Sequence, residues 1–369
     1  MLRLSRVWAM ALKELVVVLL DRRAQTTLIL SPILQLALFG LATTLEVKNI
    51  DLGVVNRDSG IVAERVLAAL DGSRNIRVIH YYPTSAVLGT AIERRQVIAG
   101  LILPPDLSVR EARGQSGEIG LVLDGRRINS AQIVAGYLGE IVNRTGAQLR
   151  PDTVRAAPQI EPVNWFNPNL DYRWFTMPSM LAVIVAVLVM SVALQSVARE
   201  KELGTFDELM VLPLTTGEIV AGKVAPAFVV GLFNALLYVV LIPLLYGVPL
   251  TGSLALLFVA ILCFSLAITG LGLSISVLAQ SQQQAFLGGF LVLVPLILLS
   301  GYASPVDNMP HWLQLVSAVD PLSHMLIICQ GIFLKNIELS LVLHHLWPIL
   351  AVAVVTLGMA NILFRKGRD

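Results

Sequence analysis

The sequence predicts an α-helical polytopic membrane protein with six transmembrane helices, an N-terminal interfacial helix and an inserted α/β extracytoplasmic domain; a family resemblance described below adds re-entrant outer helices. Three observations lead to this fold. Of the 369 residues, 56% are hydrophobic and only 14% are charged. Several long runs contain no Lys, Arg, Asp or Glu, whereas residues 45–173 contain 15 of the 27 basic and 14 of the 25 acidic side chains. This composition excludes a disordered chain, a nucleic-acid-binding arm and an ordinary soluble enzyme.

Residues 1–23 predict a cytoplasmic interfacial helix. Lys13 and Glu14 interrupt the apolar stretch, and no small-residue cleavage site precedes Asp21, so the pattern is not that of a cleaved signal peptide. Charged and apolar side chains recur at helical spacing on different faces, as in helices that lie along the inner leaflet. We expect Arg6, Trp8, Lys13 and Glu14 to anchor this helix. A plain cytoplasmic extension of the first crossing is the alternative.

The runs without charge predict the membrane crossings. A bilayer core about 30 Å thick needs about 20 apolar helical residues. The run at 224–306 is too long for one crossing, and a tight turn at 247–253 and an uncharged polar break at 280–284 divide it. Because lipid offers the backbone no hydrogen-bond partner, each crossing must be helical. The six crossings are expected at residues 24–45, 174–198, 224–246, 254–279, 285–303 and 339–364.

The short loops predict the orientation. With six crossings, the N-terminus, the loops at 199–223 and 280–284 and the tail at 365–369 share one side. That side has eleven Lys and Arg, and the other side, apart from the large insert, has only Lys335. The positive-inside rule therefore places both termini in the cytoplasm. The five crossings after the insert form a bundle within residues 174–364.

Residues 46–173 predict an extracytoplasmic α/β domain with one sheet. Strand and helix patterns alternate along this stretch, which at about 125 residues can bury its own core. His80 is its only histidine, with neither a Ser-His-acid set nor a metal-ligand cluster beside it, so we expect no catalytic residue and no metal site. The strands are expected at 50–56, 76–81, 97–103 and 118–123, and the helices at 61–70, 85–94 and 130–148.

The polar side chains of the predicted crossings indicate whether an ion gradient could drive movement of a solute through them. We expect them to contain no ionisable group at mid-membrane depth, which disfavours a proton- or sodium-driven mechanism. Gln35, Gln195 and Asn234 are the candidates for a translocation path, since buried amides need a partner or water. Residues 217–224 match the G-x-x-x-x-G-K skeleton, but Val224 replaces the required hydroxyl and the stretch enters a crossing. We expect no cofactor on this chain; if ATP drives this protein, another chain binds the ATP and Mg.

The loop at 199–213 contains the densest charge cluster outside the insert. Its opposite charges precede an apolar edge formed by Phe206, Leu209 and Met210, and this pattern suits a short helix that docks on a soluble partner. A solvated loop that only sets the topology is the alternative.

Two stretches resemble signatures of the ABC-2 type transporter permeases. Residues 199–213 are similar to R-E-x-E-x-G-T-x-E-x-L…P, with Asp207 at a variable position, and residues 300–324 are similar to S-G-x-x-x-P…M-P-x-W-L-Q…P-x-x-H. Residues 165–168, Trp-Phe-Asn-Pro, also fit the drug-export branch, in which a large extracytoplasmic domain follows the first crossing. Together these resemblances extend over nearly the whole chain.

The resemblance implies a permease that pairs with a second copy or a paralogue and contacts nucleotide-binding ATPase subunits. It implies that the coupling helix at 199–213 contacts the ATPase through Arg199, Glu200, Lys201, Glu202, Thr205, Glu208 and Leu209. It further implies a re-entrant outer cap at 305–334, where prolines break any single long helix. The residues expected to shape this cap are Pro305, Met309, Pro310, Trp312 and Pro321.

We therefore expect an ATP-driven exporter of amphipathic drugs or lipid-like molecules in a bacterial inner membrane. Its partners would be ATPase subunits, the lipid bilayer and a candidate periplasmic adaptor, with no nucleic acid. Two alternatives remain open. A secondary drug carrier would transport without an ATPase and respond to a proton gradient, and a membrane-anchored receptor would bind its ligand through residues 45–173 alone.

Overall fold

The structure is a computed structural model that describes residues 3–42, 50–115, 117–124, 128–149 and 171–366. The chain divides into two compact units. We call Thr44–Val163 the sheet unit, and we call Met1–Thr43 together with Asn164–Asp369 the helical unit. The motif at residues 165–168 lies outside the described residues.

The sheet unit contains a four-stranded sheet in the order β2-β1-β3-β4. Strand β1 is parallel to both of its neighbours, and β3 pairs with β4 in the antiparallel sense. The strands are β1 (Ile50–Asn56), β2 (Ile76–Tyr81), β3 (Ala99–Leu103) and β4 (Gly120–Leu123), and the helices are α3 (Ile61–Asp71), α4 (Ser85–Glu93), α5 (Leu107–Ala112) and α6 (Ile128–Leu149).

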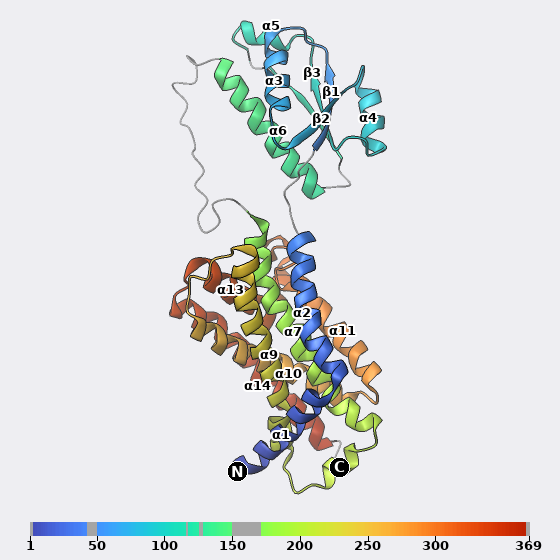
Figure 1. Cartoon of the computed structure of the whole chain (residues 1–369), viewed down its shortest axis with the longest axis vertical. Helices are drawn as coiled ribbons and strands as arrows, with labels where there is room; N and C mark the ends of the chain where they lie inside the picture. Colours follow the sequence, from blue (N-terminus) through green and yellow to red (C-terminus); the bar gives the residue numbers. More distant parts are fainter. Residues whose placement is uncertain (1–2, 43–49, 116, 125–127, 150–170, 367–369) are drawn as a thin grey trace. The chain divides into compact units, whose positions relative to one another are not determined.

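The two faces of this sheet bury different side chains. Helices α3 and α6 lie on one face and α4 on the other (Figure 1). Because neighbouring strand side chains point to opposite faces, Leu52 and Val54 pack towards α3 and α6, and Val55 packs with Leu88 of α4. Gly53 and Gly100 are paired in register beneath Leu88, and a Cβ on either would lie within 2.5 Å of its side chain.

The helical unit contains five helices long and apolar enough to cross a membrane, and up to seven spans if each of two bent pairs counts as one, among the described residues. The six expected crossings fall within this range. The five are α7 (Tyr172–Glu202), α9 (Thr216–Tyr246), α10 (Leu254–Leu278), α11 (Gln282–Leu299) and α14 (Leu339–Lys366); the bent pairs join α1 (Leu4–Leu20) to α2 (Arg22–Ala42), and α12 (His311–Ser317) to α13 with η4 (Pro321–Lys335).

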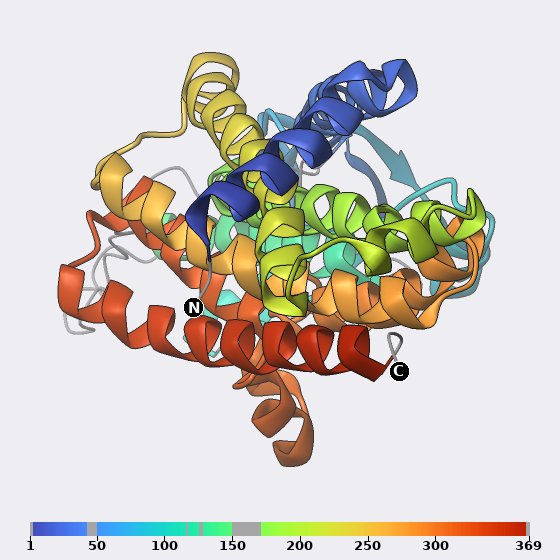
Figure 2. The ribbon, with the colours of Figure 1, turned by 90° about the horizontal axis from the view of Figure 1, so that it is seen from below.

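Helix α7 is the most deeply buried of the five and forms the centre of the helical unit. Helices α9, α10, α11 and α13 all pack against it, and α10 and α14 pack closely together. Helix α1 crosses the first half of α9, as the view from below shows (Figure 2). The close crossing is possible because Gly222 of α9 lies beneath Met10 of α1.

Several helix boundaries differ from the expected crossings, and two of these differences lie beside the charged residues described below. Helix α9 begins at Thr216, eight residues before the expected start at 224, because Thr215 and Glu218 form a capping box. Helix α7 continues to Glu202, so residues 199–202 belong to a long helix and the short helix α8 covers only Phe206–Val211. In both cases the expected boundary was drawn at the first charged residue, and the helix continues through it.

The segment from 305 to 334 is broken at its prolines. Pro305 precedes the short η3 turn (Val306–Asn308), Pro310 precedes α12, and Pro321 occupies the first turn of α13. Between α12 and α13 the chain bends by 75°. Trp312 is exposed, whereas Pro321 is buried. The geometry is that of a broken span or a re-entrant loop.

Candidate functional site

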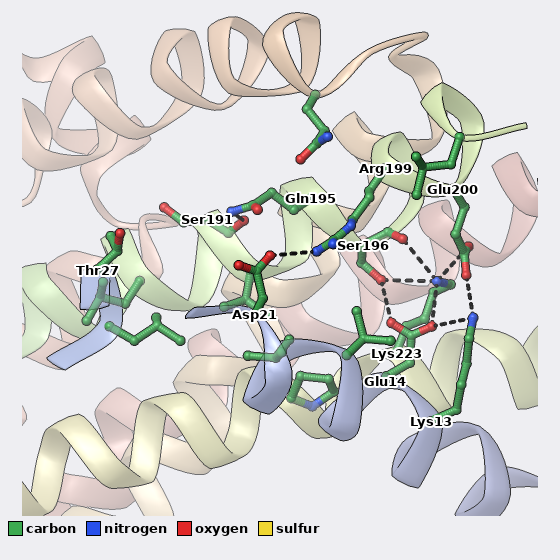
Figure 3. Close-up of a pocket in the computed structure, with 18 of the residues that line it drawn as sticks. Lys13, Glu14, Asp21, Thr27, Ser191, Gln195, Ser196, Arg199, Glu200 and Lys223 are labelled. Atoms are coloured by element: carbon green, nitrogen blue, oxygen red, sulfur yellow. Dashed lines mark hydrogen bonds and ion pairs between the residues drawn. The ribbon is translucent and has the colours of Figure 1, made fainter. Parts of the chain in front are cut away.

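A pocket of about 630 Å³ lies between the bend from α1 to α2, helix α7 and the start of α11 (Figure 3). Its polar end is formed by charged side chains of α1, α7 and α9, and the rest of its wall is mostly apolar. The charged residues that line it are Lys13, Glu14, Asp21, Arg199, Glu200 and Lys223.

Lys223 is the centre of a buried charge cluster. Only 1% of this residue is exposed. Its Nζ lies 3.0 Å from Glu14 Oε1 and 2.9 Å from Glu200 Oε2, and it also donates to the backbone and hydroxyl oxygens of Ser196 at 3.2 Å. An unpaired ammonium would be very costly at this depth, and the two carboxylates offset that cost.

Lys13 completes the cluster from the outer side. Its Nζ lies 2.7 Å from Glu200 Oε1 and 3.4 Å from Glu14 Oε1, and half of its side chain is exposed. The two lysines and the two glutamates, which come from α1, α7 and α9, balance one another in formal charge. We refer to Lys13, Glu14, Glu200 and Lys223 as the charge cluster. It binds the N-terminal helix to the two long helices beneath it.

Further polar contacts fix both ends of α1. At its C-terminal end, Asp21 pairs with Arg199 of α7 at 2.9 Å. At its N-terminal end, the Arg3 backbone N–H donates to Glu218 at 2.9 Å, and Arg6 Nη1 donates to the Pro213 carbonyl oxygen at 2.5 Å. Helix α1 is therefore attached to the connection between α8 and α9 as well as to α7.

The connection after α7 is also attached to α10 and α11. Lys201 donates to the Val277 carbonyl oxygen near the end of α10, and its Nζ lies 5.3 Å from the centroid of the Phe206 ring. The Glu202 carboxylate accepts hydrogen bonds from the Gln282 backbone N–H at 2.9 Å and from its side-chain amide at 3.3 Å. The connection is therefore attached to α10 and α11 as well as to α7, from which it continues.

Two of the residues predicted to contact the ATPase are buried in the helical unit instead. Glu200 belongs to the charge cluster, and Leu209 is 4% exposed in a core with Met10 and Ile219. Glu200 and Leu209 therefore do not form a docking surface, contrary to the prediction. The apolar side of this amphipathic segment packs on α1 and α9 of the same chain. The side chains that remain exposed on this segment include those of Glu202, Thr205, Asp207 and Glu208.

The interfacial-helix residues divide in the same way. Trp8 is 69% exposed and lies on the outer face of α1 with exposed Leu12. Glu14 is buried in the charge cluster, so it does not anchor the helix to a membrane surface. The crossings were expected to contain no ionisable group at mid-membrane depth. Glu200 lies near the end of α7 and Lys223 near the start of α9, both outside the expected crossings, so this expectation stays a prediction.

The three candidates for a translocation path do not line one cavity. Gln195 lines the pocket and donates to the Ser191 carbonyl oxygen at 3.3 Å. Gln35 of α2 donates to Ser31 at 3.2 Å. Asn234 is fully buried in α9, where its amide donates to the Val230 carbonyl oxygen at 2.9 Å and its Oδ1 has no partner among the described residues.

The G-x-x-x-x-G-K match at 217–224 lies wholly within helix α9. Its backbone N–H groups therefore belong to a helix that begins at the N-cap Thr215. A phosphate-binding loop follows a β-strand, and this segment does not. Its lysine is Lys223, which is held by two carboxylates. This arrangement does not fit a nucleotide phosphate.

The long apolar helices and their bound N-terminal helix define a multi-pass membrane protein. The chain belongs to the ABC-2 transporter family, since residues 23–362 match the family described as ABC-2 family transporter protein. The family resemblance of the sequence motifs is thereby confirmed. Membership of this family of permease subunits implies association with ATPase subunits.

Two relatives in Escherichia coli strain K12 are similar over almost the whole chain. The probable multidrug ABC transporter permease YbhR is 37% identical over 364 residues, covering 98% of each chain. The probable multidrug ABC transporter permease YbhS is 27% identical over 382 residues, covering 99% of this chain and 98% of its own. The inner membrane transport permease YhhJ of the same strain is 28% identical over 273 residues, covering 72% of each chain.

Proposed function

We propose that this chain is the transmembrane subunit of an ATP-driven exporter that moves amphipathic molecules out across a bacterial inner membrane. The observation that supports this most is the attachment of the connection after α7. Lys201, Glu202 and Leu209 hold it to α10, α11 and α9, while Thr205, Asp207 and Glu208 face outward. A soluble ATPase that pressed on the outward face would move the bundle.

The assembly follows from this role. Two permease chains, identical or paralogous, would each contact an ATPase subunit that binds ATP and Mg. Both termini would be cytoplasmic, in agreement with the excess of Lys and Arg on that side. The sheet unit would then be periplasmic, where an adaptor protein is the candidate partner, and residues 305–334 would form an outer cap.

We infer the substrate class from the names of the relatives and from the polar side chains of the membrane helices. Two of the relatives are named multidrug permeases. Apart from His344 and His345 of α14, the polar side chains of the expected crossings outside the charge cluster are mainly neutral amides and hydroxyls, which suit molecules with large apolar surfaces and few fixed charges.

Reversal of an outward charge on α8 tests the contact with the ATPase. We expect Glu208→Lys to reduce substrate-stimulated ATP hydrolysis by at least about fivefold, since like charges at an interface oppose binding. The measurement is the ATPase activity of the complex assembled with its ATP-binding partner subunit. Glu118→Lys on the exposed surface of the sheet unit is the matched control. Equal activity of the two variants, with unchanged thermal stability, would argue against the contact.

The two alternatives make different predictions. In a secondary carrier, a buried charge would exchange protons during transport, but Lys223 is ion-paired with both Glu14 and Glu200 near the ends of α7 and α9. In a receptor, the sheet unit expressed alone would bind a ligand tightly.

A further inference from the structure

We propose that the pocket between the α1–α2 bend, α7 and α11 binds one zwitterionic phospholipid of the inner leaflet. The proposal uses the topology of the proposed function, in which α1 lies on the inner membrane surface. It is independent of the outward face of α8. At about 630 Å³, the pocket lies within the size range of sites for small ligands.

The balance of charge in the lining favours a zwitterionic headgroup. Three basic side chains (Lys13, Arg199 and Lys223) and three acidic ones (Glu14, Asp21 and Glu200) line the pocket, so their formal charges cancel. A lining of this kind has no net charge to attract an anion or a cation from solution. It does offer separate sites for a phosphate and an ammonium that belong to the same headgroup.

The pair of Asp21 and Arg199 is the part of this lining that can contact a headgroup. Lys223 is closed off by its carboxylate partners, whereas the side chains of Arg199 and Asp21 are 37% and 25% exposed. Arg199 contacts Asp21 through one of its five N–H donors, and the others have the planar geometry that matches phosphate oxygens. The Asp21 carboxylate, which is already paired with Arg199, adds negative charge beside these donors, on the side where the ammonium of the headgroup would lie.

The wall of the pocket changes from polar to apolar along α7. Beyond Arg199, the helix presents Gln195 and then Leu188 to the pocket, over a rise of about 16 Å. Val18, Leu28 and Phe286 extend the apolar part from the neighbouring helices. A phospholipid has the same order of groups, with a charged head, ester carbonyls that an amide such as Gln195 can contact, and acyl chains.

Lipid binding to the purified full-length chain, with no ATPase present, tests this site. The delipidated protein is titrated with phosphatidylethanolamine, with anionic phosphatidylglycerol and with a synthetic cationic lipid of the same chains, and bound lipid is counted by native mass spectrometry. We expect one lipid per chain that resists removal, with phosphatidylethanolamine at least about fivefold tighter than either charged lipid.

Two variants with one control locate the lipid in the pocket. Val192→Trp fills the apolar part of the pocket, and we expect it to weaken binding by about tenfold. Phe286→Ser, at an exposed position that does not threaten folding, should weaken it less. Val259→Trp makes the same change on exposed α10 outside the pocket lining and should bind as the unchanged protein does.

Equal binding by Val192→Trp, Phe286→Ser and Val259→Trp, or a preference for either charged lipid, would overturn the proposal and would indicate nonspecific surface lipid only. Because no ATPase takes part in the lipid titration, a negative result there would not contradict the ATP-driven function. Conversely, a Glu208→Lys complex with normal ATPase activity would contradict that function without affecting lipid binding.

Discussion

Replacement of Lys223 by methionine is expected to destabilise the protein by about 3–5 kcal/mol, because it leaves an uncompensated charge in a buried ion-pair network. In the Lys223→Met variant, Glu14 and Glu200 would share the single remaining cation, Lys13. The side chain of Lys223 is completely enclosed, so water cannot take the place of its ammonium group. Helix α1 should separate from α7 and α9.

The measurement is the thermal midpoint of the purified protein in detergent. Lys366→Met, at an exposed lysine, is the control and should change the midpoint little. The double variant Lys223→Met/Glu14→Gln restores the balance of one lysine against one glutamate, and we expect it to recover part of the lost stability. A double variant no more stable than Lys223→Met would mean that charge balance is not what stabilises this site.

Replacement of Gly222 by leucine is expected to displace α1 and to uncouple ATP hydrolysis from substrate. A Cβ at Gly222 would lie 2.4 Å from Met10 Cγ and 3.3 Å from the Ala11 backbone nitrogen, so both the side chain and the helix above it must move. Overpacking of this kind costs about 1–3 kcal/mol. Because α1 is bound to Pro213 and Glu218, its displacement also shifts the connection from α8 to α9.

The test compares stability and substrate-stimulated ATPase activity in the assembled complex. Gly358→Leu in α14 places the same side chain where no atom lies within 4 Å, and it should leave both properties nearly unchanged. In the double variant Gly222→Leu/Met10→Ala the smaller Met10 replacement makes room for the leucine, and both properties should partly return. If Gly222→Leu retains full substrate stimulation, the position of α1 does not matter for coupling.

The membrane helices could be predicted from sequence because their signal is local. A run such as 254–279 has no charged side chain, and α10 occupies Leu254–Leu278. The prolines of 305–334 likewise indicate the observed breaks, since each acts on its own turn of helix. The start of α9 and the end of α7 were misplaced because a charged residue was taken to end a crossing.

The candidate site could not be predicted because its interactions are not local. Lys223 lies 209 residues from Glu14 and 23 from Glu200, and each of the three is a polar residue that sequence alone assigns to a solvated loop or surface helix. One signal was available: Glu14 interrupts an apolar stretch, where a carboxylate needs a partner if the helix packs on others. The exposed and buried sides of α8 also depend on helices far away in sequence, so Leu209 could not be distinguished from Glu208 as a contact residue.

The central claim is that this chain transports only when a separate ATPase acts on it. The direct measurement is the movement of a fluorescent amphipathic dye in lipid vesicles that contain the purified chain, with and without its ATP-binding partner and ATP. We expect dye movement only when both partner and ATP are present, and none when a proton gradient is imposed on the chain alone. Dye transport driven by that gradient without the ATPase would contradict the claim.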